Sequence, residues 1–123
     1  MANKTEPAKF MTVSDILLQV SPALQGVMIR TIGRLSNDDF NMNLVWIQDH
    51  KTSLYRLVVD CSRITPFPFK DQDGLMYQFI GEVDCSKHNI VMIKALLYRC
   101  CEGLDMDTYI QAYTKRMELL QQS

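Results

Sequence analysis

Alternation of hydrophobic and polar side chains recurs along the chain and predicts five β-strands followed by one helix. The first and third runs alternate apolar with polar residues, a pattern typical of half-buried strands, and the other three are short runs rich in apolar residues. The predicted strands cover residues 26–35, 42–48, 54–61, 75–83 and 90–99. Because closure removes exposed strand edges, this pattern favours an all-β fold, a single five-stranded OB-fold barrel with a C-terminal amphipathic α-helix. An SH3-like barrel is the alternative, but its strands are usually shorter than residues 90–99.

Glycines near the ends of two strands indicate bends in the barrel. The first strand reads GVMIRTIGRL and the fourth reads LMYQFIGEV, so Gly33 and Gly81 occupy similar places. A strand glycine usually marks a bulge or a tight bend. If Ile32 and Leu35 both face the core, the alternation must slip near Gly33, and a bulge there would supply the slip. The first strand would then serve two sheet faces.

The ends of the chain and its longest connection complete the predicted domain. Residues 1–9 are polar, so we expect a flexible N-terminal arm ahead of one domain over residues 10–123. The apolar stretch 10–20 is expected to pack across one end of the core. Residues 62–74 contain two prolines, which cannot donate hydrogen bonds to a sheet. This segment is therefore a connection, with room for one helical turn.

A helix is predicted over residues 105–121, with Asp105 as its N-cap and basic residues late in the helix, as the helix dipole favours. One apolar stripe runs along it, formed by Met106, Tyr109, Ile110, Tyr113, Met117 and Leu120. The stripe could cover the end of its own barrel. A partner interface is favoured, because Met and Tyr are common at such surfaces and the stripe spans ~20 Å, beyond the width of one barrel.

Composition restricts the function classes. The chain has 123 residues, a formal net charge of −1 and a pI near 6.1. A free-standing nucleic-acid binder normally carries a basic footprint, so any nucleic-acid role should be shared with a partner. No apolar run is long enough for a membrane span, and the first ten residues lack the apolar core of a secretory signal. We therefore expect an intracellular protein that does not bind a membrane.

Motifs for catalysis or metal binding are missing from the sequence. The four cysteines lie at positions 61, 85, 100 and 101 without the paired spacing of zinc ligands. His50 and His88 each stand alone in predicted turns. No nucleophile elbow, phosphate-binding glycine loop or zinc-protease motif occurs. We expect reduced, mostly buried thiols, no cofactor, no metal and no enzymatic activity.

Aromatic and basic residues on the second and third predicted strands are candidates for nucleic-acid binding. OB-folds that bind oligonucleotides place stacking aromatics on these strands. The candidates are Trp46 and Tyr55 for stacking, with Lys51 and Arg56 for phosphate. The alternative is that these rings are buried in the core. Core burial is favoured for Trp46, which lies among aliphatic residues. For Tyr55, core burial and nucleic-acid binding are equally supported.

Three motifs in order resemble those of a known family. They are RTIGRL at residues 30–35, YxxxGE at Tyr77–Glu82 and KAxxxxCxEG at Lys94–Gly103, with Thr65-Pro66-Phe67 between the first two. Together they resemble the Ten-one family, the small OB-fold subunit of the CST telomere-capping complex. The resemblance covers most of the chain.

The resemblance implies that the chain pairs with the N-terminal OB domain of a larger Stn-one subunit. It implies contacts by the first strand, here Met28 and Arg30, and by the terminal helix, here Tyr109, Tyr113, Met117 and Leu120. With the large CST subunit, the complex would bind single-stranded telomeric DNA, restrain telomerase and support fill-in by polymerase α-primase, at telomeres in the nucleus. A small subunit of a replication protein A-like complex and an independent oligonucleotide-binding module are the alternatives.

Overall fold

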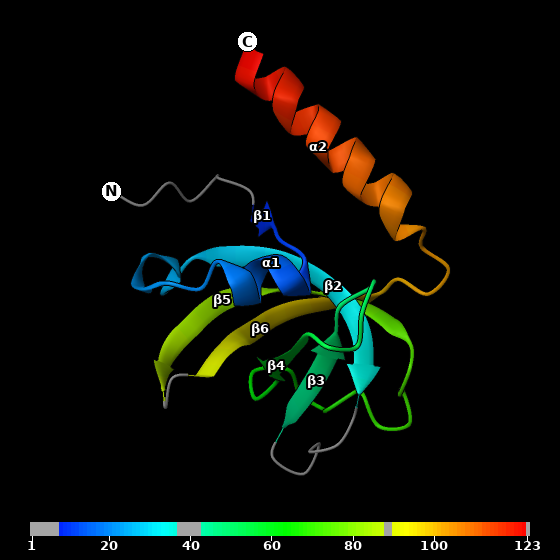
Figure 1. The fold of residues 1–123 in the computed structure, drawn as a ribbon. Helices are drawn as coiled ribbons and strands as arrows, with labels where there is room; N and C mark the ends of the chain where they lie inside the picture. Colours follow the sequence, from blue (N-terminus) through cyan, green and yellow to red (C-terminus); the bar gives the residue numbers. More distant parts are fainter. Residues whose placement is uncertain (1–7, 37–42, 88–89, 123) are drawn as a thin grey trace.

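Six strands surround a hydrophobic core in the computed structural model, which describes residues 8–36, 43–87 and 90–122 (Figure 1). The strands are β1 (Lys9–Phe10), β2 (Met28–Ser36), β3 (Leu44–Gln48), β4 (Arg56–Asp60), β5 (Met76–Lys87) and β6 (Ile90–Cys100). Two α-helices, α1 (Val13–Leu18) and α2 (Met106–Gln122), and a 3-10 helix, η1 (Pro22–Leu24), accompany them. None of the helices in these ranges is long and apolar enough to cross a membrane.

The sheet closes on itself as a barrel. The strand order is β1-β2-β3-β4-β6-β5, and an antiparallel pairing of β2 with β5 joins the two sides. All five predicted strands are confirmed, with ends that shift by a few residues. The prediction missed β1, two residues that pair parallel with β2. Lys9, assigned to the flexible arm, lies in this strand, and residues 1–7 lie outside the described residues.

The core fills the barrel from its ends as well as from its strands. Helix α1 lies across one end, where Val13 and Ile16 are fully buried. This confirms that the apolar stretch after residue 9 covers an end of the core. The connection 61–75 forms turns and bends without the helical turn allowed by the sequence. It inserts Phe69, which is fully buried and contacts the rings of Tyr77 and Phe79 at centroid distances of 5.3 and 5.4 Å.

The predicted bulge at Gly33 is wrong. Pairing of β2 with β5 runs without a shift from Met28 to Arg34. Ile32 is buried outside the barrel, in a cluster with residues of α2, so the alternation needs no slip. Gly33 instead permits close packing: a Cβ there would lie 2.7 Å from the Gln48 carbonyl oxygen. Strand β2 pairs with β5 from Met28 to Arg34 and with β3 from Arg34 to Ser36, so it joins the two sides of the one sheet.

The predicted irregularity at Gly81 is confirmed. The register of β5 against β6 shifts between Ile80 and Gly81, which leaves Leu96 as the extra residue of β6. A Cβ on Gly81 would meet the backbone of Lys94 and Ala95, so this approach requires glycine. The shift also turns Leu97 away from the core face that Ala95 occupies, and Leu97 is 62% exposed.

Candidate functional site

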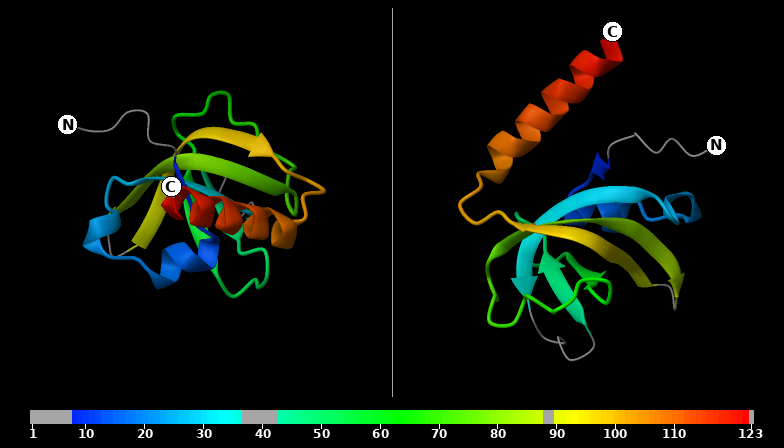
Figure 2. Two further views of the ribbon diagram at one scale, coloured as in Figure 1. Left: turned by 90° about the horizontal axis from the view of Figure 1, so that it is seen from above. Right: turned by 180° about the vertical axis from the view of Figure 1, so that it is seen from behind.

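Helix α2 begins at a capped end beside the barrel. The Asp105 carboxylate accepts hydrogen bonds from the backbone N–H groups of Asp107 and Thr108, at 3.1 and 3.3 Å, and from the Thr108 hydroxyl at 3.0 Å. The bonds from Thr108 lower the pKa of Asp105 from its usual value. The predicted N-cap is confirmed. From it the helix rises away from the barrel, and its C-terminal half stands clear of the strands (Figures 1 and 2).

The N-terminal half of α2 packs on the outer face of β2 through a second hydrophobic cluster. The cluster contains the buried residues Phe10, Ile32, Met76, Cys101 and Met106, with Tyr109, Ile110 and Tyr113 packed against it. The ring of Phe10 meets those of Tyr109 and Tyr113 edge-on, at centroid distances of 5.1 and 5.4 Å. The Phe10 N–H also donates to the Tyr113 hydroxyl at 3.2 Å. The short strand β1 therefore anchors the helix.

The C-terminal half of α2 exposes its apolar side chains. Met117, Leu119 and Leu120 are 36%, 60% and 57% exposed. They continue the stripe whose first half contacts the barrel. Lys115 and Arg116 lie beside them and are also exposed. Sequence periodicity missed Leu119, because it falls one position off the predicted stripe.

The outer face of β2 adds polar atoms without partners beside this cluster. Met28 is 36% exposed, and Arg30 is half-buried. Arg30 Nε and Gln78 Oε1 are buried without a hydrogen-bond partner among the described residues. Residues two apart on a strand face the same side, and so do residues that pair across neighbouring strands. Arg30 lies two residues before Ile32, and Gln78 pairs with Ile32, so the side chains of Arg30 and Gln78 face the side where α2 packs. Buried polar atoms are normally paired, so an incoming partner could satisfy these two.

Of the four nucleic-acid candidates, the structure brings together Trp46 and Arg56. The Arg56 guanidinium lies 4.8 Å from the Trp46 ring centroid, and it donates to the Ser36 hydroxyl at 3.1 Å. The interpretation of Trp46 as core is wrong. It is half-buried on the outer face, because its neighbours Val45 and Ile47 take the inward positions.

The other two candidates are separated from that pair. Tyr55 packs against the barrel core, since it has the same parity as the buried Leu57 and Val59 of β4. Lys51 is exposed in the loop between β3 and β4. The outer face of β3 and β4 therefore offers one stacked Trp–Arg pair rather than a row of aromatic rings.

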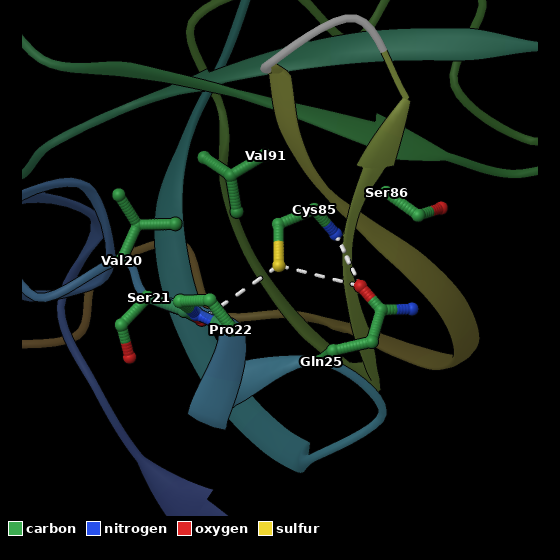
Figure 3. Close-up of a pocket in the computed structure, with 7 residues that line it drawn as sticks. All are labelled: Val20, Ser21, Pro22, Gln25, Cys85, Ser86 and Val91. Atoms are coloured by element: carbon green, nitrogen blue, oxygen red, sulfur yellow. Dashed lines mark hydrogen bonds between the residues drawn. The ribbon is translucent and has the colours of Figure 1, made fainter.

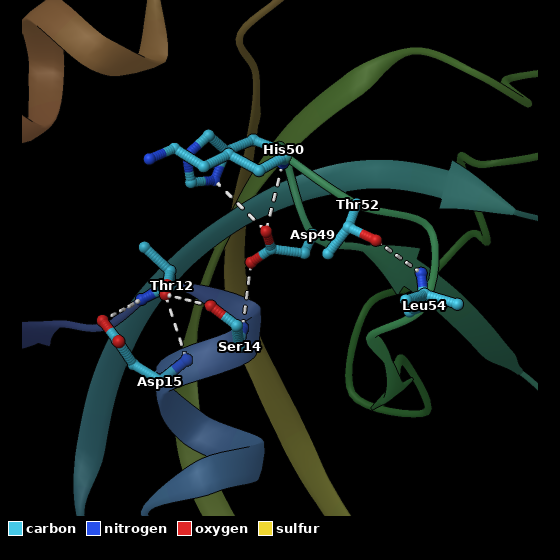
Figure 4. A network of polar contacts seen from close by, with 8 residues as sticks. Thr12, Ser14, Asp15, Asp49, His50, Thr52 and Leu54 are labelled. Atoms are coloured by element: carbon cyan, nitrogen blue, oxygen red, sulfur yellow. Dashed lines mark hydrogen bonds and ion pairs between the residues drawn. The ribbon is translucent and has the colours of Figure 1, made fainter.

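A polar network, missed by the sequence analysis, holds the loop that carries Lys51 against α1 (Figure 4). The buried Asp49 carboxylate accepts from the Ser14 N–H at 2.9 Å and from the Lys51 N–H at 3.1 Å. His50 Nδ1 lies 3.8 Å from the same carboxylate. Thr12 and Asp15 form a capping box on α1. Their spacing is the sequence signal that could have located this helix.

A pocket opens beside β5 and the start of β6 (Figure 3). It is lined by Val20, Ser21, Pro22, Gln25, Cys85, Ser86 and Val91. The Cys85 thiol donates to the Gln25 side-chain oxygen at 3.3 Å and contacts the Ser21 carbonyl oxygen at 3.7 Å. All four cysteines are free; Cys61 and Cys101 are buried, whereas Cys100 is exposed and Cys85 half-buried. Among the described residues, no three potential metal ligands gather at one point.

Comparison with known proteins gives one family and a set of similar folds. The family described as telomere-capping, CST complex subunit matches residues 4–123. The solved S. pombe Stn1–Ten1 complex is similar with a TM-score of 0.66 and 17% identity, over 93% of this chain and 95% of that chain. The telomere-capping protein Ten1 from Saccharomyces pombe is similar with a TM-score of 0.65 and 18% identity, over 91% and 99%.

A third similar structure is an OBody bound to hen egg-white lysozyme. Its TM-score is 0.52 and its identity 14%, over 81% of this chain and 100% of that chain. No curated protein matches the sequence significantly. At these identities the solved structures establish the fold, and the OB-fold expectation is confirmed.

Proposed function

Because the chain belongs to the telomere-capping CST complex subunit family, we propose that it is the small OB-fold subunit that pairs with a larger subunit of the Stn-one type. The likeness to the solved Stn1–Ten1 complex supports this pairing. Through that partner the chain joins the large CST subunit at telomeres in the nucleus. The assembled complex binds single-stranded telomeric DNA, restrains telomerase and supports C-strand fill-in by polymerase α-primase. The chain, one domain over residues 10–123, acts without catalysis.

The partner contact is formed by the exposed half of α2 and by the outer face of β2. The observation that carries this proposal is the exposure of Met117, Leu119 and Leu120 on a helix whose first half is already packed. On the outer face of β2, beside the cluster that holds the first half of the helix, Arg30 Nε and Gln78 Oε1 are buried without partners among the described residues. Apolar residues that a chain leaves uncovered, next to polar atoms left unpaired, are features of a surface completed by another subunit.

The double variant Met117→Glu with Leu120→Glu tests this contact. Both side chains are already partly exposed, so the variant should fold with a melting temperature close to that of the wild type. Burying two carboxylates without counter-charges costs several kcal/mol, which removes binding of ordinary affinity. Leu54→Glu is the matched control, because Leu54 is an apolar side chain 87% exposed on the loop between β3 and β4.

Co-purification with the Stn-one-type subunit and circular dichroism on the same samples separate the outcomes. We expect the double variant to be folded and to lose the partner, while the control retains it. A folded double variant that still co-purifies would refute the interface. An unfolded double variant would return the distal helix to the core of this domain.

A second function, direct binding of a DNA strand, is favoured by the Trp46–Arg56 pair. Stacking on one aromatic ring with one adjacent cation gives little counterion release. We therefore expect the isolated chain to bind a G-rich single strand only in the range of ~10⁻⁴ to 10⁻⁶ M. Fluorescence anisotropy measures this. Nanomolar binding by the chain alone would favour the independent oligonucleotide-binding module over the assembly subunit.

A further inference from the structure

The C-terminal half of β6 has an open edge. Strand β6 pairs with β4 only from Met92 to Lys94, and then continues to Cys100. Over residues 95–100, the described part of the chain pairs β6 with β5 alone. Successive residues of a strand direct their backbone N–H and C=O groups to alternate sides. About half of the backbone groups in this stretch therefore point away from the sheet.

A groove with both apolar and polar lining runs along this edge. Its lining residues are Arg63, Ile64, Thr65, Pro66, Pro68, Leu96, Leu97 and Tyr98. Leu97 and Tyr98 are 62% and 44% exposed, and Leu97 faces outward because of the register shift at Gly81. Natural edge strands are commonly protected by charged side chains or proline. Between Ala95 and Cys100 the only charged residue is Arg99.

We propose that this edge binds an extended segment of a protein partner, which adds to β6 as a further strand. In this mode the backbone groups of the edge provide affinity, and pockets for alternate side chains provide specificity. The apolar lining selects apolar side chains on the face of the segment that meets the groove. Arg63 lines the groove and Arg99 follows it on the strand, and neither forms an ion pair with a described residue. The segment therefore carries an acidic residue opposite them.

Charge also argues against the other occupants. If two copies of this chain paired through their β6 edges, the same arginines of both copies would be brought together, and like charges across an interface are unfavourable. A nucleic-acid strand would use several stacking rings and several cations, whereas the lining of the groove presents one ring, that of Tyr98, and one cation, Arg63. None of the residues that line the groove belongs to the α2 contact, although Arg99, beyond the groove, pairs across the sheet with Gln78 of that contact.

Selection from a library tests the proposal. Random peptides of about ten residues, the upper length of an ordinary strand, are displayed on phage and selected on the immobilised full chain. Peptides that also bind the Leu97→Asp variant are then removed from the pool. Leu97 is an exposed position, so this variant should fold. Leu54→Asp is the matched control, since Leu54 is exposed and apolar on a different part of the barrel. Melting by circular dichroism establishes that both variants are folded.

We expect surviving peptides to alternate apolar residues and to contain Asp or Glu. A synthetic copy should bind wild type and Leu54→Asp equally, and should bind Leu97→Asp and Arg63→Glu roughly tenfold more weakly or worse. Methylating alternate backbone nitrogens of the peptide should abolish binding, because an added strand needs those donors. The proposal is overturned if no peptide survives depletion or if the methylated peptide binds as well. It is also overturned if oligo-dT occupies the groove, or if sedimentation shows self-association that Leu97→Asp removes.

Discussion

Replacing Phe10 by alanine should release α2 from the barrel while leaving the barrel itself folded. Phe10 is 6% exposed and lies at the centre of the cluster that holds the helix. Its ring contacts both Tyr109 and Tyr113, and its N–H donates to the Tyr113 hydroxyl. The hydrophobic contacts that join the helix to the barrel lie in this cluster. The substitution therefore removes the central contact of the helix with the barrel.

The size of the effect follows from these contacts. Each edge-on aromatic pair contributes ~0.5–1.5 kcal/mol beyond area burial, and burying a Phe side chain contributes ~1.5–3 kcal/mol. For two pairs the sum is ~2.5–6 kcal/mol, and the usual range for Phe→Ala in a core, ~3–5 kcal/mol, lies within it. Helix α2 has 17 residues, and an isolated helix of that length is only marginally stable in water. Without the anchor, the helix should open in a large fraction of molecules.

Amide hydrogen exchange resolved along the chain measures this opening. In Phe10→Ala, protection of the α2 amides should fall roughly a hundredfold to a few thousandfold, and protection in β3 and β4 should stay near that of the wild type. Tyr113→Phe is the matched control. It keeps both ring contacts and removes only the hydroxyl that accepts the Phe10 N–H, so it should cost ~1 kcal/mol. Affinity for the Stn-one-type partner should fall with the helix, because a disordered surface must be ordered again on binding.

Two results would refute this reasoning. If β3 and β4 lose protection as much as α2 does, the helix and the barrel unfold as one unit and the local anchor is wrong. If α2 keeps its protection, Phe10 does not hold the helix. A larger loss in Tyr113→Phe than in Phe10→Ala would show that the hydrogen bond, rather than ring packing, dominates.

Three further predictions concern the barrel. Gly33→Val places a branched side chain against the carbonyl oxygen of the last residue of β3. We expect the free energy of unfolding to fall by ~1–3 kcal/mol and the melting temperature to fall by roughly 4–12 °C. An unchanged melting temperature would contradict the close approach. Burial raises the pKa of the Cys61 thiol to about 12, so a thiol reagent at neutral pH should modify the exposed Cys100 and spare Cys61 until the chain unfolds. Hydrogen bonds from the Ser86 hydroxyl and backbone hold the pKa of Asp84 well below its usual range. These bonds stabilise the fold fully above the unfolded-state pKa of Asp84, and their contribution is lost as pH falls through the folded-state pKa. The melting temperature of Asp84→Asn should therefore be lower than that of the wild type at neutral pH. The difference between the two melting temperatures should shrink below about pH 4.

The regular strands could be predicted from sequence because their alternation is local. In residues 54–61, Leu57 and Val59 alternate with Arg56 and Asp60, and the structure buries both Leu57 and Val59. The two residues of β1 could not be predicted in this way, because a strand of two residues has no period to detect. Its pairing with β2 is a long-range contact that only the closed barrel creates. The same limit explains the error at Ile32, whose burial comes from α2 and Phe10 rather than from the barrel interior.

The candidate site was predictable as a list of residue types but not as an arrangement. Trp46 and Arg56 were both candidates, and the cross-strand pairing of β3 with β4 brings them together. Tyr55 directly precedes Arg56, yet it faces the core, because neighbouring residues of an extended chain point to opposite faces. Sequence alone could assign these opposite faces only if the position of the core were already known.

The terminal helix shows why an apolar stripe does not identify what it contacts. Its periodicity is the same from Met106 to Leu120, since a 3.6-residue period reports only which side of the helix is apolar. The structure divides the stripe: the hydrophobic cluster shared with the barrel reaches Tyr113, and the nine residues from Thr114 to Gln122 extend the helix by ~13 Å further. The first half of the stripe stabilises this domain, as an ordinary amphipathic helix does. The second half leaves Met117, Leu119 and Leu120 exposed on a helix held in place by its first half, so the proposed partner would meet a preorganised surface at a low cost in conformational entropy.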